Sequence, residues 1–378
     1  MRLARLLVSE VRNLADQQID LIRGLNLLVG PNGQGKSSLL ESVYLLGTTR
    51  SFRTSRLGEV VRIGGGPARV AGDGELPGER LAILISQKER RYIKNGKPAG
   101  AADYIGTLDV VALSSDIVQG FRRRPAERRR FLDRMALATY PGYLYELREL
   151  RRACAQRAIL SASGTVGPER RAWDEKAASL ALPVARRRRE MAEALERNLR
   201  ATAPAIFLEG GALTVKHLSR PPFDPANELR YVEELAAIFS AQGRSGGGST
   251  VPRDADIGRG DPPPIRRETP AGPLRDDLAI AIEERDLIRY GSAGQFRSLL
   301  TAAVLAEMTR LRDAKGEFPV LLLDDVDADL DESRYSALLS SLHGEAQTLA
   351  ATSKPGLVLG QATPERRFEV REGRIAVC

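Results

Sequence analysis

The glycine-rich segment Gly30-Pro31-Asn32-Gly33-Gln34-Gly35-Lys36-Ser37 has the residue types and spacing of a phosphate-binding loop. Its glycines allow backbone N–H groups to turn inward around phosphate oxygens. Lys36 can reach the outer phosphates as a point charge, and the Ser37 hydroxyl can ligate Mg²⁺. The apolar run Leu25–Val29 precedes the segment, and residues 38–46 follow it with helical spacing. This strand, loop and helix context favours a nucleotide site over a glycine turn that binds nothing.

Two adjacent carboxylates, Asp324 and Asp325, follow the apolar run Val320–Leu323 far downstream of the glycine-rich segment. One carboxylate can orient a Mg²⁺ shell, and the next can activate the attacking water. Acidic residues at strand ends are common, so the pair gains weight only together with the phosphate loop. An ordinary small kinase or GTPase would place the two motifs much closer together.

A third motif, Ser292-Ala293-Gly294-Gln295, is predicted to begin a helix. A Ser-x-Gly-Gln element in ATPase heads of the ABC class binds the γ-phosphate of nucleotide held by the opposing subunit. A helix N-terminus with a hydroxyl and a glycine suits an anion. The alternative is a simple helix cap at Ser292.

Residues 1–120 are predicted to form the N-terminal half of an ATPase head, which contains the phosphate loop. We expect strands at 2–9 and 17–29, and a helix from the phosphate loop to about Gly47. Short alternating runs predict antiparallel strands at 68–71, 81–86 and 90–94, with a further strand at 107–113. Asn95-Gly96 is a hairpin turn signal.

Residues 121–205 predict a helical lobe. Pro125 suits an early helical position, and 143–160 and 171–199 favour two antiparallel helices. The run Arg186–Arg189 is interpreted as a solvated face, with DNA contact as the alternative.

Residues 206–378 predict the C-terminal half of the head. The strands expected there are 213–216, 277–282, 286–290, 320–323 and 348–352, and the helices are 227–239, 291–312 and 331–342. Residues 368–378 predict a closing hairpin. Residues 242–273 are rich in Gly, Pro and Ser and are interpreted as a mobile loop. The fold class is therefore α/β: an ATPase head with an antiparallel β segment and an inserted helical lobe.

The composition limits the classes of molecule that the chain is expected to bind. The chain has 378 residues, with 57 Lys and Arg against 49 Asp and Glu, a formal net charge of +8 and a pI near 9.6. This balance suits a polyanion such as nucleic acid, although a high-GC genome also enriches Arg. Two cysteines and two histidines disfavour a disulfide framework and thiolate or histidine metal sites. Without a signal-peptide core or an apolar span, we expect a soluble cytoplasmic protein.

Taken together, the motifs resemble the RecF family, recombination mediator ATPases related to the heads of structural-maintenance-of-chromosomes proteins. The matching stretches run nearly end to end: Val11–Asn13, Gly30–Ser37, Leu40-Glu41, Arg50–Arg53, Asn95–Lys97, Pro125–Asp133, Arg275–Asp277, Gly291–Arg297, Leu322–Val326 and Leu330-Asp331. The sequence departs from the family pattern at Leu274, usually His, at Phe296, usually Gln, at the shortened Leu113–Asp116, and at Arg123-Arg124. These departures bear on hydrolysis rate, lobe contacts and partner surfaces rather than on ATP binding.

The resemblance implies bound ATP and Mg²⁺ and assigns residues to them. The implied nucleotide-binding set is Gly30, Pro31, Asn32, Gly33, Gln34, Gly35, Lys36, Ser37, Ser38, Arg12, Asn13, Ser292, Gly294 and Gln295. Ser37 and Asp324 would hold the metal, and Asp325, Asp324 and Lys36 form the catalytic set. Ser292 and Gly294 would act in trans. Asp329 and Asp331 would couple the two sites, and Thr352 would sense the γ-phosphate.

The resemblance also implies an ATP-dependent homodimer with weak, DNA-dependent ATPase activity. It would bind single-stranded DNA and junctions of single and double strand. RecF proteins work with RecR and RecO to load RecA, in replication recovery and the SOS response.

Four other interpretations compete with this one. A divergent SMC-like head could act in DNA or chromosome maintenance outside RecA loading. A small phosphotransferase gives no account of Ser292–Gln295. A structural chromosome-organising head predicts coiled coils longer than residues 134–202 allow. A transporter ATPase requires a Leu-Ser-Gly-Gly-Gln element, which Tyr290–Gln295 does not supply.

Overall fold

The computed structural model describes residues 1–206, 212–242, 271–325, 338, 342, 345–354 and 365–378. The chain divides into two compact units. The first comprises Met1–Arg122, Asn198–Gly210 and Gly291–Cys378, and the second comprises Arg123–Arg197 and Gly211–Tyr290. Residues 211–290, expected in the C-terminal half of the head, therefore group with the helical lobe.

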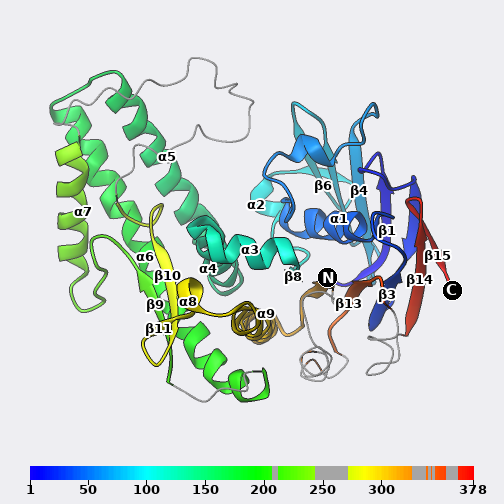
Figure 1. The fold of residues 1–378 in the computed structure, drawn as a ribbon. Coiled ribbons are helices and arrows are strands. Elements are labelled where there is room, and N and C mark those ends of the chain that lie inside the picture. Colours follow the sequence, from blue (N-terminus) through cyan, green and yellow to red (C-terminus); the bar gives the residue numbers. More distant parts are fainter. Residues whose placement is uncertain (207–211, 243–270, 326–337, 339–341, 343–344, 355–364) are drawn as a thin grey trace. The chain divides into compact units, whose positions relative to one another are not determined.

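The first unit contains a mostly parallel sheet with strand order β15-β14-β3-β13-β12-β8. Its strands are β3 (Leu25–Val29), β8 (Val110–Leu113), β12 (Val320–Leu323), β13 (Thr348–Thr352), β14 (Arg366–Arg371) and β15 (Arg374–Val377). All five residues of β3 are buried, as expected for a central parallel strand. Figure 1 shows the C-terminal hairpin of β14 and β15 beside β3, and β14 pairs with β3 in parallel.

An antiparallel sheet with order β2-β1-β4-β5-β6-β7 forms the rest of the β structure of this unit. Its strands are β1 (Leu3–Ser9), β2 (Gln17–Asp20), β4 (Ala68–Gly74), β5 (Arg80–Ile85), β6 (Arg90–Lys94) and β7 (Lys97–Ala99). The Asn95-Gly96 turn has φ values of 52° and 78°, which confirms the predicted hairpin.

Helix α1 (Lys36–Thr48) packs against strands of both sheets. Nearly every residue of α1 is buried, including Leu39, Val43 and Leu46. A helix that is buried all round must lie inside the core rather than at its surface. The remaining elements of this unit include η1 (Leu57–Val60), α2 (Ala101–Tyr104), α3 (Ser115–Arg123) and α9 (Ala293–Lys315).

Two strand predictions for the first unit were wrong in their boundaries or partners. Residues 17–29 form two strands rather than one, because β2 pairs with β1 whereas β3 joins the parallel sheet. Residues 107–113 shorten to β8, which pairs in parallel with β12 rather than extending the antiparallel segment.

The second unit combines helices with a small sheet of order β11-β10-β9. Its helices are α4 (Pro125–Thr139), α5 (Tyr143–Ala162), α7 (Glu228–Gln242), α8 (Leu287–Tyr290) and α6 (Pro168–Ile206), of which the part up to Arg197 belongs to this unit. Its strands are β9 (Leu213–Leu218), β10 (Asp277–Ile282) and β11 (Arg285–Asp286). The bidentate pair between Arg128 of α4 and Asp277 of β10 joins this sheet to the helices. The strand predicted at 286–290 is wrong beyond Asp286, because the following residues form α8.

The interpretation of Arg186–Arg189 as a solvated face was wrong for Arg188, which is buried. Arg188 is 1% exposed, and its Nε donates to Asp133 at 2.8 Å. Arg186 pairs with Glu228, and Arg189 with Glu193. Much of this charge run is therefore neutralised within the unit itself.

Candidate functional site

The phosphate loop connects buried β3 to buried α1, so both of its ends are held by the core. A Cβ atom on Gly30 would lie 2.3 Å from the Val370 carbonyl oxygen of β14, so no side chain fits at this position. Gly35 has a φ of 114°, which L side chains rarely adopt. These two positions need glycine for steric and conformational reasons, and together they set the course of the loop.

Lys36 lies beneath the loop with 4% of its surface exposed. Its Nζ donates to the carbonyl oxygens of Gly30 at 2.7 Å and Pro31 at 2.9 Å. A buried ammonium group needs such acceptors, because desolvation without compensation is costly. The cation is thus held at the loop, next to where phosphates would gather.

Neighbouring segments brace the loop from two sides. The Gln34 carbonyl oxygen accepts from the Gly373 N–H at 2.9 Å, and its side-chain oxygen accepts from the Glu372 N–H at 2.6 Å. Asn13 Nδ2 donates to the Gly33 carbonyl at 3.0 Å, and Asn13 Oδ1 accepts from Ser38 Oγ at 3.0 Å. Asn13 and Ser38, both predicted to contact nucleotide, therefore meet at the loop, and their contact holds its shape.

Asp324 meets the phosphate loop from the end of β12. Its Oδ1 accepts from Ser37 Oγ at 2.9 Å, and its backbone N–H donates to the Leu113 carbonyl of β8 at 3.0 Å. Burial, with a smaller contribution from the neighbouring Asp325 carboxylate, raises the pKa of Asp324 to about 6, against the lowering effect of the Ser37 hydrogen bond. Two adjacent acids with a hydroxyl group in contact form a donor set that fits a divalent cation.

The raised pKa of Asp324 predicts how pH affects the stability of the protein without nucleotide. The folded-state pKa lies above the ordinary value of 3.8. The folded protein therefore binds the proton more tightly, and stability is lost as pH rises towards about 6. Asp324→Asn removes the free-energy cost of burying an ionised carboxylate. The replacement should therefore raise the Tm at pH 7.5 by about 2–4 °C, with a smaller gain at pH 5.

Thermal unfolding in EDTA, followed by circular dichroism at the two pH values, measures this gain. Asp20→Asn on the exposed β2 is the matched control, and its small effect should not change with pH in this way. A loss of stability for Asp324→Asn at pH 7.5 would show that the ionised carboxylate is not strained.

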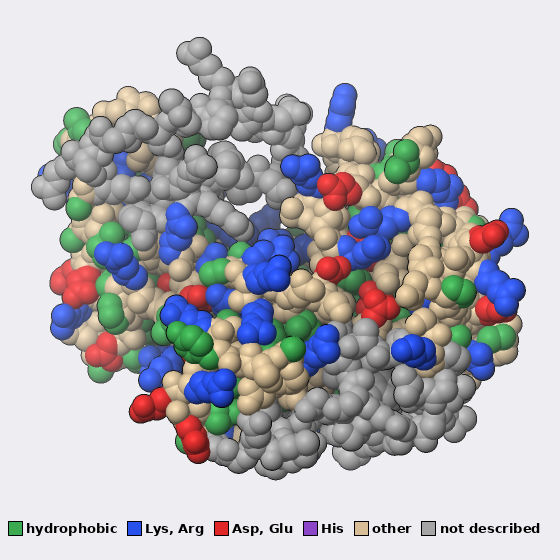
Figure 2. Space-filling view, in the orientation of Figure 1, with side chains coloured by type: hydrophobic (Ala, Val, Ile, Leu, Met, Phe, Trp, Pro, Cys, Tyr) green, Lys and Arg blue, Asp and Glu red, His purple; other side chains and the backbone are tan. Residues whose placement is uncertain are grey.

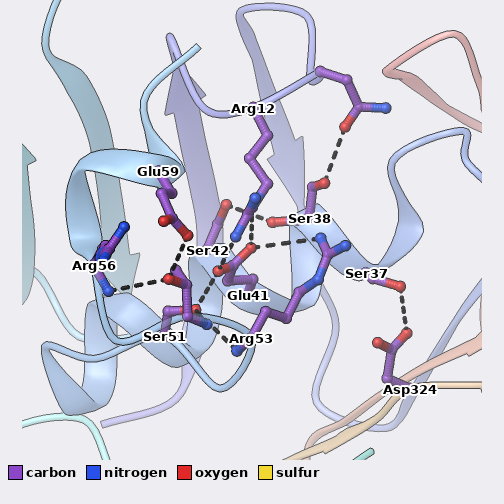
Figure 3. Close-up of polar contacts among 12 residues, drawn as sticks. Arg12, Ser37, Ser38, Glu41, Ser42, Ser51, Arg53, Arg56, Glu59 and Asp324 are labelled. Atoms are coloured by element: carbon purple, nitrogen blue, oxygen red, sulfur yellow. Dashed lines mark hydrogen bonds and ion pairs between the residues drawn. The ribbon is translucent and has the colours of Figure 1, made fainter. Parts of the chain in front are cut away.

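Glu41 is a fully buried carboxylate in α1 that gathers cations beside the loop. Figure 3 shows it among the guanidinium groups of Arg12 and Arg53 and the hydroxyl of Ser51. Arg12 Nη2 donates to Glu41 Oε1 at 2.8 Å, and Arg53 Nη1 lies 3.7 Å from Glu41 Oε2. Ser51 Oγ also donates to Glu41. Glu41 thus orients two guanidinium groups from separate segments.

Arg12 and Arg53 line a cavity of about 540 Å³, together with residues of the phosphate loop. Predicted residues in its lining are Arg12, Asn13, Asn32, Gly33, Gly35, Lys36, Ser37, Ser38 and Asp325. The lining also includes Arg53, Glu59, Val61, Arg62 and Ile63, to which the sequence analysis assigned no role. Arg53 belongs to the matched stretch Arg50–Arg53, which was a usable signal. The other four carry no motif and reach the cavity through backbone pairing, including an isolated bridge between Val11 and Val61.

Ser292, Gly294 and Gln295 are not among the described lining residues of this cavity. They form the start of α9, where Ser292 Oγ accepts from the Gln295 N–H at 3.1 Å and Gln295 Oε1 accepts from the Ser292 N–H at 2.9 Å. This capping box confirms the helix start predicted there. The phosphate loop and the Ser292–Gln295 motif of this unit are therefore separate surfaces.

Thr352 ends β13 and is paired in register with Val29, the last residue of β3. It is fully buried and lies next to the strand that leads into the phosphate loop. Asp329 and Asp331 lie outside the described residues, as do most of the helix predicted at 331–342 and most of the loop predicted at 242–273. Among the described residues, no group of three His, Cys, Asp or Glu side chains could hold a metal by itself. None of the described helices combines the length and apolarity that a membrane span requires.

Comparison with known proteins identifies the family to which this architecture belongs. The family described as "RecF/RecN/SMC N terminal domain" matches residues 2–370. The "DNA replication and repair protein RecF" of Anaeromyxobacter dehalogenans (strain 2CP-C) is 34% identical over 402 residues, covering 100% of this chain and 99% of that protein. The chain belongs to the RecF family. The RecF of Myxococcus xanthus (strain DK1622) is 33% identical, covering 100% of this chain and 97% of that protein.

A solved RecF structure has the same fold. It is described as the recombination mediator protein RecF-ATP in the RecFOR pathway, with a TM-score of 0.82, 24% identity, and coverage of 100% of this chain and 97% of that one. The RecF-family chain is thus an α/β ATPase head of the SMC type, and the predicted fold class is confirmed. The arrangement of β3, the phosphate loop and β12 is the part of this fold that the sequence motifs identified.

Proposed function

We propose that this RecF-family chain is an ATP-dependent DNA-binding protein of recombinational repair. Two copies would close on ATP at gapped DNA or at junctions of single and double strand. With RecR and RecO, the dimer would help to load RecA and would serve replication recovery and the SOS response. The names of the relatives and the RecFOR pathway of the solved neighbour support this proposal.

One observation carries the ATP-gated part of the proposal. The phosphate cavity is lined by Lys36, Ser37 and Asp325, whereas Ser292 and Gly294 lie on a separate, exposed helix start. A γ-phosphate in the cavity would therefore be enclosed only when a second copy supplies its Ser292–Gln295. Binding energy shared in this way links ATP to dimerisation.

The site residues predicted from the sequence have the following roles in the proposed function. Lys36 and the loop N–H groups would bind the phosphates, and Arg12, held by Glu41, would add a further cation. Ser37 and Asp324 would hold Mg²⁺, which supplies charge neutralisation for phosphoryl transfer. Asp325 would accept a proton from water, in a weak ATPase activity stimulated by DNA. Thr352 would sense the γ-phosphate.

The replacement Ser292→Arg tests the contribution in trans. A long cation at this exposed position should prevent dimerisation with ATP, yet ATP affinity should stay within about twofold because the phosphate cavity is unchanged. Fluorescent ATP titration and sedimentation velocity measure the two quantities. Loss of the N-cap costs about 1 kcal/mol, so Ser292→Asn, which can still cap, controls for helix fraying. Equal loss of binding and dimerisation in Ser292→Arg would leave Ser292 a purely structural residue.

DNA binding should depend steeply on salt. In Figure 2, many exposed side chains are Lys and Arg, with fewer Asp and Glu among them. Each phosphate contact to duplex should add about 0.9 to the slope of log K against log salt. Titration of gapped, duplex and single-stranded DNA at several salt concentrations, with and without ATP, measures the slope. A flat response would contradict the proposed contacts between the protein and DNA phosphates.

A further inference from the structure

The start of α9 has one surface exposed to solvent and one packed against the protein. Ser292, Ala293 and Gly294 are exposed, whereas Gly291 and Phe296 on either side of them are buried. A Cβ atom added to Gly294 would meet no heavy atom within 4 Å. The segment therefore has an open outer surface and a packed underside, and the underside determines how the outer surface is presented.

The capping box makes the outer surface rigid and leaves the Ser292 hydroxyl hydrogen available for a further hydrogen bond. Ser292 Oγ accepts a hydrogen bond from the Gln295 N–H. A hydroxyl group that accepts one bond still has its own hydrogen to donate. Capping and phosphate binding are therefore compatible roles for Ser292, provided that the helix start is correctly aimed.

Arg122, in the last turn of α3, contacts the segment from beneath on both sides. Its Nη2 donates to the Gly291 carbonyl oxygen at 2.7 Å. The same guanidinium group lies 5.2 Å from the centre of the Phe296 ring. Phe121 adds a ring contact with Phe296 at 6.3 Å between centroids. One planar group thus holds the residue before Ser292 and the residue after Gln295.

We infer that Arg122 is a positioning residue that holds Ser292–Gln295 in the conformation offered to the ATP of a second copy, an inference that rests on the proposed function. Phe296 takes part in the same device. The RecF pattern usually has Gln here, and Phe296 instead gives the guanidinium group an aromatic face. The departure seen in the sequence thus has a packing partner in α3.

Helix α3 also connects this device to the phosphate cavity. It follows β8, whose last residue, Leu113, accepts from the Asp324 N–H. Its nine residues span roughly 13 Å. Along the chain, α3 therefore lies between the strand that contacts Asp324 and Arg122, which contacts Gly291.

Sedimentation velocity with ATP tests this inference. Arg122→Ala should raise the dissociation constant of the ATP-bound dimer by about tenfold, because it removes a charge-assisted hydrogen bond and a stacked cation. Arg122→Lys keeps the charge but lacks the planar fork, so it should fall between the two. ATP affinity of the monomer should not change, because Arg122 is not among the described lining residues of the cavity.

Two further variants separate positioning from charge and from folding. Arg123→Ala removes the same charge one residue away, at an exposed position, and should leave the dimer unchanged. Phe296→Leu should weaken the dimer, and the double variant with Arg122→Ala should lose less than the two single losses predict, because both act through one contact.

The outcomes are distinct. Wild-type dimerisation by Arg122→Ala, while Ser292→Arg is monomeric, would overturn the role of Arg122 and leave the proposed function intact. Equal loss of ATP binding and dimerisation in Arg122→Ala would also overturn it, because the residue would then only support the fold. A wild-type chain that stays monomeric with ATP would overturn the proposed function and this inference together.

Discussion

Replacing Lys36 by alanine is expected to lower ATP affinity by about a hundredfold or more. The ammonium group is buried and already aimed at the loop, where it contacts the Gly30 and Pro31 carbonyls. Removing one member of such a buried charge interaction typically costs 2–5 kcal/mol in binding. Isothermal titration calorimetry with ATP and Mg²⁺ measures the loss.

Lys97→Ala provides the control for this change. Lys97 is an exposed residue of β7 next to the hairpin turn and is not among the described residues that line the cavity, so its loss removes the same charge at another position. Thermal unfolding of both variants checks that folding is retained. Unchanged ATP affinity in a folded Lys36→Ala variant would contradict the assignment of the phosphate loop.

Replacing Asp325 by asparagine is expected to trap the ATP-bound dimer. Asp325 lines the cavity next to Ser37 and Lys36, where a carboxylate can accept the proton of the attacking water. Loss of such a base typically slows the chemical step by about 10²–10⁴-fold. In the proposed dimer ATP holds the two copies together, so slower hydrolysis should prolong the lifetime of the dimer.

Asparagine is the appropriate replacement for conformational reasons. The backbone φ of Asp325 is 51°, a left-handed conformation that Asn tolerates and most other residues do not. An alanine would add backbone strain to the chemical change. Sedimentation velocity over several hours with ATP measures the dimer, and phosphate release measures hydrolysis. A monomeric Asp325→Asn variant that still binds ATP would contradict the two-copy site.

The sequence predicted the site best where function depends on a contiguous segment. The phosphate loop lies between β3 and α1 as expected, because glycine spacing and flanking apolar runs are local signals. The capping box at Ser292 is equally local. Asp324 was predicted to act with Ser37, and the two side chains are in contact. Here the motif pairing supplied the long-range information.

Contacts between distant segments could not be predicted in this way. Arg188 was interpreted as part of a solvated face because its partner Asp133 lies 55 residues away and gives no local signal. Residues 17–29 were predicted as one strand but form β2 and β3 in two different sheets. Strand pairing, and not residue type, decides which sheet a strand joins. Glu59 and Ile63 belong to a segment that pairs with residues 10–12, through the bridge of Val11 with Val61 and neighbouring backbone hydrogen bonds.

The central claim is that each ATP site is completed by two copies of the chain, and mixing two inactive variants tests it most directly. Lys36→Ala cannot hold ATP but keeps Ser292, whereas Ser292→Arg keeps its phosphate loop but cannot close on a partner. Each variant alone should be monomeric with ATP. In the mixture, the phosphate loop of the Ser292→Arg copy can be enclosed by the intact Ser292 of the Lys36→Ala copy. Sedimentation of the two chains with distinct fluorescent labels should therefore reveal an ATP-dependent heterodimer. A mixture that stays as monomeric as its components, under conditions in which the wild-type chain dimerises, would contradict a site shared between copies.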